Sequence, residues 1–360
     1  MVTFDRLKGT NWLRLHETMQ LRHQMLQDIS FAQITQEKAD RVCNLRGQFT
    51  GRIGYGVYVT DTHLKHIALP KQNFFEQHTL SLKQLLESGF SARISALDGC
   101  VVVLNNADID SDYRMESFSV FYNNHPDTIF IGWDTDNHHT LQISMAFATL
   151  VDFYVQTQIE NFYDLSRFNA VHAFVPTGLL NLSRAGALEL FPDILAAKRS
   201  DELRGYFGFH GPFTWRNRVV TTLAEKHSNI GFFSESRGFG VPDNYLRDLI
   251  DFKIHCVVPV LNDASARIHE ILATGGIPVV PQSLRYHPAL DGLADSHIVY
   301  YSLNDVLDTS SIILEGLRKF DTQGLHGIRA RFDYGMVNHS DFNLMKILRH
   351  ASKVFGFEVL

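Results

Sequence analysis

Four continuous apolar runs constrain the fold of this chain more than any other feature of its sequence. They are Cys100–Leu104, Thr128–Trp133, Ile254–Val260 and Ile277–Pro281. Runs of this length are typical of strands buried on both faces, as in parallel sheets whose crossover connections are helices. Helical stretches alternate with such runs along the chain, so we predict a doubly wound α/β architecture.

The 360 residues are enough for two domains of ordinary size. We predict an N-terminal Rossmann-like domain at 1–177, a linker at 178–204, a second domain at 205–335 and a helical tail at 336–360. Further expected elements are a helix through about Asp40, a strand at Arg52–Thr60, and helices at Thr79–Ser88 and Leu303–Phe320.

Composition narrows the class of partner and the cellular location. A net charge of −6 argues against nucleic-acid binding through an overall basic surface. Three widely separated cysteines and the lack of a long apolar segment favour a cytoplasmic protein, and peripheral contact with the inner face of a membrane stays open.

The stretch 251–282 predicts a strand, a loop, a helix and a second strand, which together form one βαβ unit. In a parallel sheet the crevice beyond the carboxyl ends of the strands binds ligands, and the loop 261–265 falls there. Arg267 and Glu270 then lie three residues apart on one face of the expected helix Ala264–Thr274. A cation near a helix N-terminus suits a phosphate, and a carboxylate can bind sugar hydroxyls.

These residues belong to a longer pattern, Arg267-x-x-Glu270-x-x-x-x-Gly275-x-x-Pro278-Val279. It resembles the signature helix of GT-B glycosyltransferases, especially their exostosin-like branch. The resemblance implies two Rossmann-like domains facing across a cleft, with a C-terminal helix that crosses back to the first domain. It also implies a nucleotide-sugar donor, a carbohydrate or glycoconjugate acceptor, and no cofactor or divalent metal.

Other candidates for donor binding surround this helix. The loop that contains Gly211 precedes a helix with Arg216 and Arg218, and we favour Arg218 over Arg216, with surface exposure of both as the alternative. Arg237 follows another predicted strand, where a plain turn is an equal alternative. The complete predicted donor set is Gly211, Arg218, Arg237, Asn262, Ser265, Arg267 and Glu270.

The polar cluster after the run Thr128–Trp133 is the candidate source of a general base. It contains Asp134, Asp136 and His138, and carboxylate and imidazole groups accept protons near neutral pH. The cluster also resembles the DxD metal motif of the other large glycosyltransferase fold, although the signature helix belongs to the fold that normally needs no metal. A polar loop that caps the following helix is the structural alternative.

We therefore expect an enzyme that transfers a sugar from a nucleotide-activated donor to an acceptor hydroxyl. A nucleotide-sugar epimerase or hydrolase on the same fold is one alternative, and a non-catalytic nucleotide-sugar-binding protein is another. Inversion and retention at the sugar carbon are both compatible with this sequence.

Overall fold

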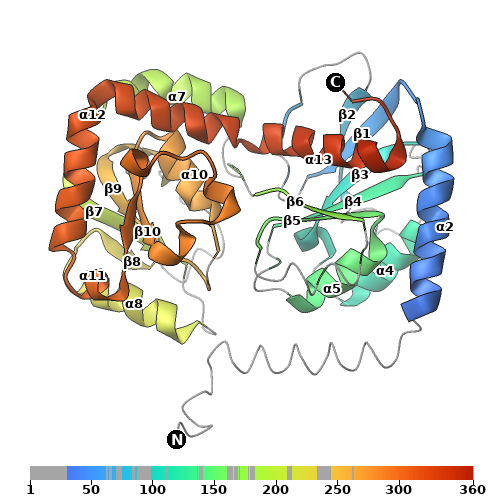
Figure 1. The fold of residues 1–360 in the computed structure, drawn as a ribbon, viewed down its shortest axis with the longest axis horizontal. Helices are drawn as coiled ribbons and strands as arrows, with labels where there is room; N and C mark the ends of the chain where they lie inside the picture. Colours follow the sequence, from blue (N-terminus) through green and yellow to red (C-terminus); the bar gives the residue numbers. More distant parts are fainter. Residues whose placement is uncertain are drawn as a thin grey trace, which may run out of the picture. The chain divides into compact units, whose positions relative to one another are not determined.

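In the computed structural model the chain forms two compact units (Figure 1). The structure describes residues 31–61, 64, 67–69, 75–82, 86, 99–109, 112–135, 137, 141–159, 165, 169, 171–176, 178, 183–208, 213–232, 245–261 and 263–359. The N-terminal unit contains the described residues up to Pro176 together with the segment that begins at Asp341, and the C-terminal unit contains Thr177–Ser340.

The N-terminal unit is built on a parallel sheet with the strand order β2-β1-β3-β4-β5-β6. Its strands are β1 (Tyr55–Thr60), β2 (Phe75–Leu80), β3 (Val101–Asn105), β4 (Ile129–Asp134), β5 (Phe153–Gln156) and β6 (His172–Phe174). The chain passes from β1 outward to β2 and then returns to β3 on the other side of β1. This reversal is a topological switch point, the place where open α/β sheets bind ligands.

Helices cover both faces of this sheet (Figure 1). One core packs α2 (Phe31–Phe49) and α13 (Ser340–Phe355) against inward side chains such as Val57, Val103 and Ile131. The other core packs α4 (Asp112–Asn123) and α5 (Leu141–Leu150) against Val102, Phe130 and their neighbours, and a short 3-10 turn, η3 (Asn106–Ile109), follows β3. Helix α13 is therefore part of the N-terminal unit's core, although it follows the C-terminal unit in sequence.

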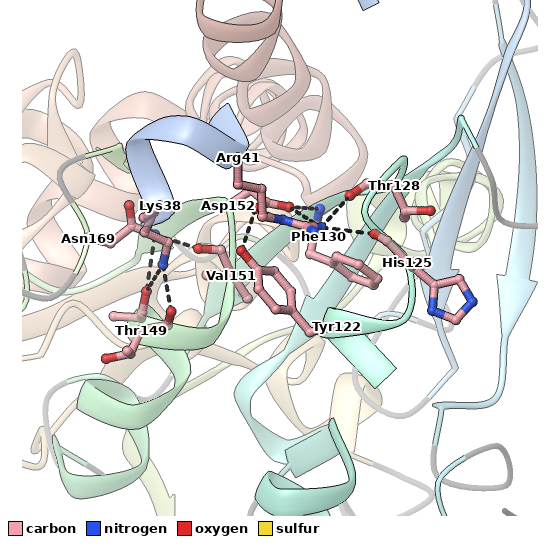
Figure 2. A network of polar contacts seen from close by, with 11 residues as sticks. Lys38, Arg41, Tyr122, His125, Thr128, Phe130, Thr149, Val151, Asp152 and Asn169 are labelled. Carbon is pink, nitrogen blue, oxygen red and sulfur yellow. Dashed lines mark hydrogen bonds and ion pairs between the residues drawn. The ribbon is translucent and has the colours of Figure 1, made fainter. Parts of the chain in front are cut away.

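A polar network fixes α2 to the edge of the sheet where β4 and β5 begin (Figure 2). Arg41 donates to Asp152 Oδ1 at 2.7 Å and to the carbonyl oxygen atoms of His125 and Thr128 at 3.0 Å. Asp152 is fully buried and also accepts from Tyr122 Oη at 2.7 Å. Lys38 donates to the carbonyl oxygen atoms of Ala148 and Thr149 at the end of α5, and burial lowers its pKa to about 8.

The C-terminal unit has a second parallel sheet, with the order β11-β10-β9-β7-β8. Its strands are β7 (Ser200–Phe207), β8 (Ile230–Phe232), β9 (Phe252–Cys256), β10 (Ile277–Pro281) and β11 (Val299–Tyr301). Read from the other edge, this is the same order as in the first sheet, so the switch point lies between β7 and β9. All pairings between the described strands of both sheets are parallel.

Helices cover the second sheet on two sides as well. One side is covered by α7 (Arg184–Ala196), α8 (Thr214–Ala224), α11 (Leu303–Leu307) and α12 (Ser310–Val337). The other is covered by α9 (Tyr245–Ile250) and α10 (Ala266–Ala273), with the short 3-10 turns η5 (Gln282–Leu284), η6 (Pro288–Leu290) and η7 (Asp295–His297) leading to β11. The α/β architecture with two parallel sheets is thus confirmed, at the level of two Rossmann-like units.

Three expected elements differ from the structure. The predicted helix Thr79–Ser88 begins inside strand β2, whose residues Phe75–Leu80 pair with β1. The predicted linker 178–204 contains α7 and the start of β7, and Ala187 and Ile194 of α7 belong to the core of the C-terminal unit. The expected helix Leu303–Phe320 is instead the short α11 followed by α12, which continues to Val337 with a non-helical residue at Gly324.

Candidate functional site

The signature helix α10 has well-defined ends. At its start the Ser265 hydroxyl accepts from the Arg267 backbone N–H at 3.2 Å, which satisfies one of the free donors of the first turn. At its end Gly275 has a φ of 77°, and the backbone N–H of Gly276 donates to Ile271 O at 2.9 Å. This left-handed termination favours glycine and explains the Gly275 of the sequence pattern.

Close packing fixes the position of α10. A Cβ atom at Gly335 of α12 would lie 2.7 Å from Ala273 Cβ, so only glycine lets the two helices approach this closely. Arg331 donates to Gly275 O at 2.9 Å, and Arg199 donates to Thr274 O at 2.7 Å. Two guanidinium groups therefore lie at the carbonyl end of α10, where the helix dipole favours positive charge. Burial lowers the pKa of Arg199 to about 10 and that of Arg331 to about 9.

A chain of hydrogen bonds connects the two signature side chains. Tyr245 Oη donates to Glu270 Oε2 at 2.7 Å and accepts from Arg267 Nε at 3.2 Å. Glu270 is only 2% exposed, and Arg267 is partly buried. Burial raises the pKa of the Tyr245 hydroxyl, with the Glu270 charge as the next cause, so the hydroxyl stays protonated and can donate to the carboxylate.

A second arginine bridges the two strands at the switch point. Arg216 is 6% exposed and donates from Nε to Val258 O at 3.0 Å and from Nη1 to Gly208 O at 2.8 Å. Its guanidinium carbon lies 5.3 Å from the centroid of the Phe207 ring, and that of Arg267 lies 5.2 Å from the same ring. Burial lowers the pKa of Arg216 to about 10, and the charge of Arg267 contributes to this shift.

The carboxyl edge of β7 and β9 therefore concentrates positive charge around one aromatic ring. Two neighbouring guanidinium groups raise the electrostatic potential there, and an anion placed beside them would lower it. Arg267 and Tyr245 also line a small pocket together with Arg204, Tyr206 and His255. This edge has the chemistry of an anion-binding site with a polar side chain network behind it.

The structure brings some of the predicted donor-site residues together and separates others. Ser265, Arg267 and Glu270 lie on or beside α10. Arg218 is exposed on α8, whereas Arg216 is the buried arginine of that helix. Gly211, Arg237 and Asn262 lie outside the described residues.

The sequence did not indicate Phe207 or Tyr245, and of the two arginines of α8 it favoured the exposed Arg218 over the buried Arg216. A usable signal was present for the arginine, because Val219, Val220 and Leu223 mark the apolar face of α8 and Arg216 falls on that face at helical spacing. No comparable pattern marked Tyr245, whose role depends on the separate helix α10.

In the N-terminal unit, Asp134 ends β4 and is fully buried. Its Oδ2 atom accepts from Tyr154 Oη at 2.7 Å. Asp136 and His138 lie outside the described residues. Over the described part of the chain, no group of three or more His, Cys, Asp or Glu side chains is arranged to hold a metal ion.

With this geometry established, comparison with known proteins adds no assignment, because neither a protein-family model nor a curated protein matches the chain. Among the described helices, none is long and apolar enough to cross a membrane.

Proposed function

We propose that this protein is a glycosyltransferase of the GT-B type, which transfers a sugar from a nucleotide-activated donor to an acceptor hydroxyl. The donor diphosphate would bind at the carboxyl edge of β7 and β9, beside Arg216 and Arg267. The resemblance of the 267–279 pattern to the exostosin-like branch supports this proposal.

The observation that carries the proposal is the convergence of Arg216 and Arg267 on Phe207 at the switch point. The two guanidinium carbons lie 5.3 and 5.2 Å from the ring centroid. Arg216 hydrogen-bonds only backbone carbonyl oxygen atoms among the described residues, so its charge is not neutralised by a hydrogen-bonded carboxylate. The charge of Asp263 also acts on Arg216, although no hydrogen bond joins the two among the described contacts. A diphosphate would add negative charge beside the two guanidinium groups, at a position where open α/β sheets bind ligands.

The Glu270–Tyr245–Arg267 chain of hydrogen bonds gives the proposed site its rigidity. The Tyr245 hydroxyl donates its proton to Glu270, and the same hydroxyl oxygen accepts a hydrogen bond from Arg267. This arrangement restricts the rotation of the Arg267 side chain before any ligand arrives. A pre-oriented cation stabilises developing negative charge without further reorganisation.

In the proposed reaction, an acceptor oxygen attacks the anomeric carbon of the sugar and forms the new glycosidic bond. The bond between that carbon and the diphosphate oxygen breaks, and the nucleoside diphosphate leaves with the electron pair. Arg216 and Arg267 would stabilise the negative charge that grows on the leaving diphosphate. For the base that takes the acceptor proton, the sequence predicts Asp134, Asp136 and His138 as candidates.

A binding experiment tests the donor site. The full chain is titrated calorimetrically with UDP, GDP, CDP, ADP and dTDP, and the measurement is repeated for Arg267→Ala, Arg216→Met and Glu270→Gln. We expect one diphosphate to bind and each substitution of an arginine to weaken it about 10–100-fold, as for loss of a charge-assisted hydrogen bond. Arg218→Ala is the matched control, because this arginine is exposed on the same helix as Arg216.

Retention of full diphosphate affinity in folded Arg267→Ala and Arg216→Met would overturn the proposal. Turnover then separates the related activities. We expect consumption of the matching nucleotide sugar to depend on an added acceptor, whereas consumption without any acceptor would indicate a hydrolase or an epimerase.

A further inference from the structure

Glu270 is almost completely enclosed, although it belongs to the helix that borders the proposed donor site. It is only 2% exposed, and its Oε2 atom accepts a hydrogen bond from Tyr245 Oη at 2.7 Å. Tyr245 is itself only 7% exposed. A carboxylate that binds ribose hydroxyl groups has to present free lone pairs at an accessible surface. The enclosure of Glu270 therefore leaves little surface for the direct donor contact that the sequence predicts.

The guanidinium group of Arg267 is held by two aromatic rings and a hydrogen bond. Its central carbon lies 5.2 Å from the centroid of the Phe207 ring and 5.9 Å from that of the Tyr245 ring. Its Nε atom donates to Tyr245 Oη at 3.2 Å. A cation is attracted to the face of an aromatic ring, and a hydrogen bond restricts the rotation of the donor. The direction of Arg267 therefore depends on Tyr245, which contributes both one ring and the acceptor.

A cavity beside Arg267 makes this restraint necessary. Arg267 and Tyr245 line the cavity together with Arg204, Tyr206 and Asp248. The Asp248 carboxylate already pairs with Arg204 at 2.8 Å, and its side chain is 43% exposed. A carboxylate in the same cavity attracts a second guanidinium group. Without the bond to Tyr245, Arg267 would be free to turn toward Asp248 and away from the strand ends.

We propose that Glu270 is a positioning residue, which acts on the donor through Tyr245 and Arg267 and makes no contact with the ribose. Its carboxylate takes the Tyr245 proton, so the phenolic oxygen presents its lone pairs to Arg267. The restrained guanidinium group then stays beside Phe207 at the ends of β7 and β9. This inference rests on the proposed function, and it adds that discrimination between ribose and deoxyribose does not depend on Glu270.

The first experiment measures the restraint on Arg267 without a ligand. The full chain is prepared with isotopically labelled arginine for NMR, and the Arg267 Nε–H signal is identified by its absence in Arg267→Lys. We expect this proton to exchange with water about tenfold faster in Tyr245→Phe than in the wild type, because its acceptor is removed. Glu270→Gln should keep the wild-type rate, since an amide oxygen can still accept the Tyr245 proton. Equal rates in Tyr245→Phe and the wild type would overturn the inference.

The second experiment compares the binding of ribonucleoside and deoxyribonucleoside diphosphates. The full chain is titrated calorimetrically with the pairs UDP and dUDP, GDP and dGDP, CDP and dCDP, and ADP and dADP. Tyr245→Phe and Glu270→Met should each weaken binding by about tenfold, and the double variant should also lose about tenfold, because both changes release the same arginine. Glu270→Gln should bind with wild-type affinity. In every variant the affinity ratio within a pair should equal that of the wild type.

Two controls separate positioning from loss of the fold. The double variant Tyr245→Phe/Glu270→Met replaces both partners by apolar side chains of similar size, so their hydrogen bond is removed from both sides at once. Its thermal midpoint should therefore lie closer to that of the wild type than the midpoint of Tyr245→Phe does, while its diphosphate affinity should be as low. Arg247→Ala changes an exposed arginine of the same helix as Tyr245 and should alter neither the exchange rate nor the affinity.

The outcomes distinguish this inference from the proposed function. If Glu270→Gln changes the ratio between ribonucleoside and deoxyribonucleoside diphosphates, Glu270 contacts the ribose, so the inference is wrong and the donor site stands. If the double variant loses about a hundredfold in affinity, the two side chains act independently and the inference is wrong as well. If no diphosphate binds to the wild type, the proposed donor site fails and this inference fails with it.

Discussion

The two units share a strand order but differ in the hydrogen-bond partners of their buried arginine side chains. In the N-terminal unit, Arg41 forms a hydrogen-bonded ion pair with the buried carboxylate of Asp152 (Figure 2). In the C-terminal unit, Arg199, Arg216 and Arg331 hydrogen-bond only carbonyl and amide oxygen atoms within the described structure. A fold can therefore bury arginine with or without a paired carboxylate. An arginine without such a carboxylate leaves a positive electrostatic potential that can attract an anion.

The largest effect is expected when the carboxylate of the Arg41–Asp152 ion pair is removed. Asp152→Ala would leave Arg41, Tyr122 and the Phe130 N–H without their shared acceptor. We expect the free energy of unfolding of the N-terminal unit to fall by about 3–5 kcal/mol, as when one partner of a buried ion pair is removed. Native-state hydrogen exchange of amides in β4 and β5 measures this change.

Asp40→Ala is the control for this substitution, since Asp40 is exposed on the same helix as Arg41 and, among the described residues, bonds only Gln36 in an exposed contact. It should change stability by less than about 0.5 kcal/mol. If Asp152→Ala lowered the free energy of unfolding no more than Asp40→Ala does, the Arg41–Asp152 ion pair would not stabilise the N-terminal unit as predicted.

A smaller effect is expected when an arginine without a hydrogen-bonded carboxylate is replaced. Arg331→Met deletes a fully buried guanidinium group but, among the described residues, leaves only the oxygen atoms of Gly275 and Gln323 without a donor. We expect a loss of about 1–3 kcal/mol in the C-terminal unit, because no uncompensated charge remains. Native-state hydrogen exchange of amides in β9 and β10 measures this loss of stability. A loss larger than that caused by Asp152→Ala would contradict the difference between the two units.

The smallest expected effect concerns pH. Burial lowers the pKa of His255 from 6.5 to about 3, with the charge of Arg199 as the next cause. The folded unit therefore binds this proton less readily than the unfolded chain, so the stability from neutral His255 is complete above pH 6.5 and is lost as the pH falls toward 3. Between pH 6.5 and 5.5 the loss should be about 1 kcal/mol, because the imidazole of the unfolded chain is already half protonated at pH 6.5.

Urea unfolding of the wild type and His255→Gln at these two pH values measures that contribution. The variant keeps a polar side chain without a titrating ring, so its unfolding free energy should decrease less over the same interval. Equal decreases in both proteins would show that Arg199 and burial do not hold His255 in its neutral form.

The buried strands could be predicted from sequence because they lie at the centre of each sheet. Strand β10 matches the predicted run Ile277–Pro281, and β4 differs from its predicted run by one residue at each end. Strand β2 was missed because, among the described strands, it pairs with β1 alone at the edge of the sheet, and its sequence FEQHTL has four consecutive polar residues instead of an apolar run. The polar start of β7, with Asp201 and Glu202 exposed, likewise concealed the first half of a central strand.

The candidate site was predictable only where one helix contains several of its residues. Ser265, Arg267 and Glu270 are close in sequence, so their spacing indicated a shared location. Tyr245 and Phe207 come from separate elements, and their contacts with Arg267 follow from tertiary packing alone.

The place of α13 in the core of the N-terminal unit has a consequence for how the protein is made. Leu344, Ile347, Leu348 and Phe355 are fully buried against a sheet whose first strand begins at Tyr55. A ribosome must therefore synthesise the whole C-terminal unit before the first unit can complete its core. During that interval one face of the first sheet is left without α13, and such exposed apolar surface is where chaperones bind and aggregation starts.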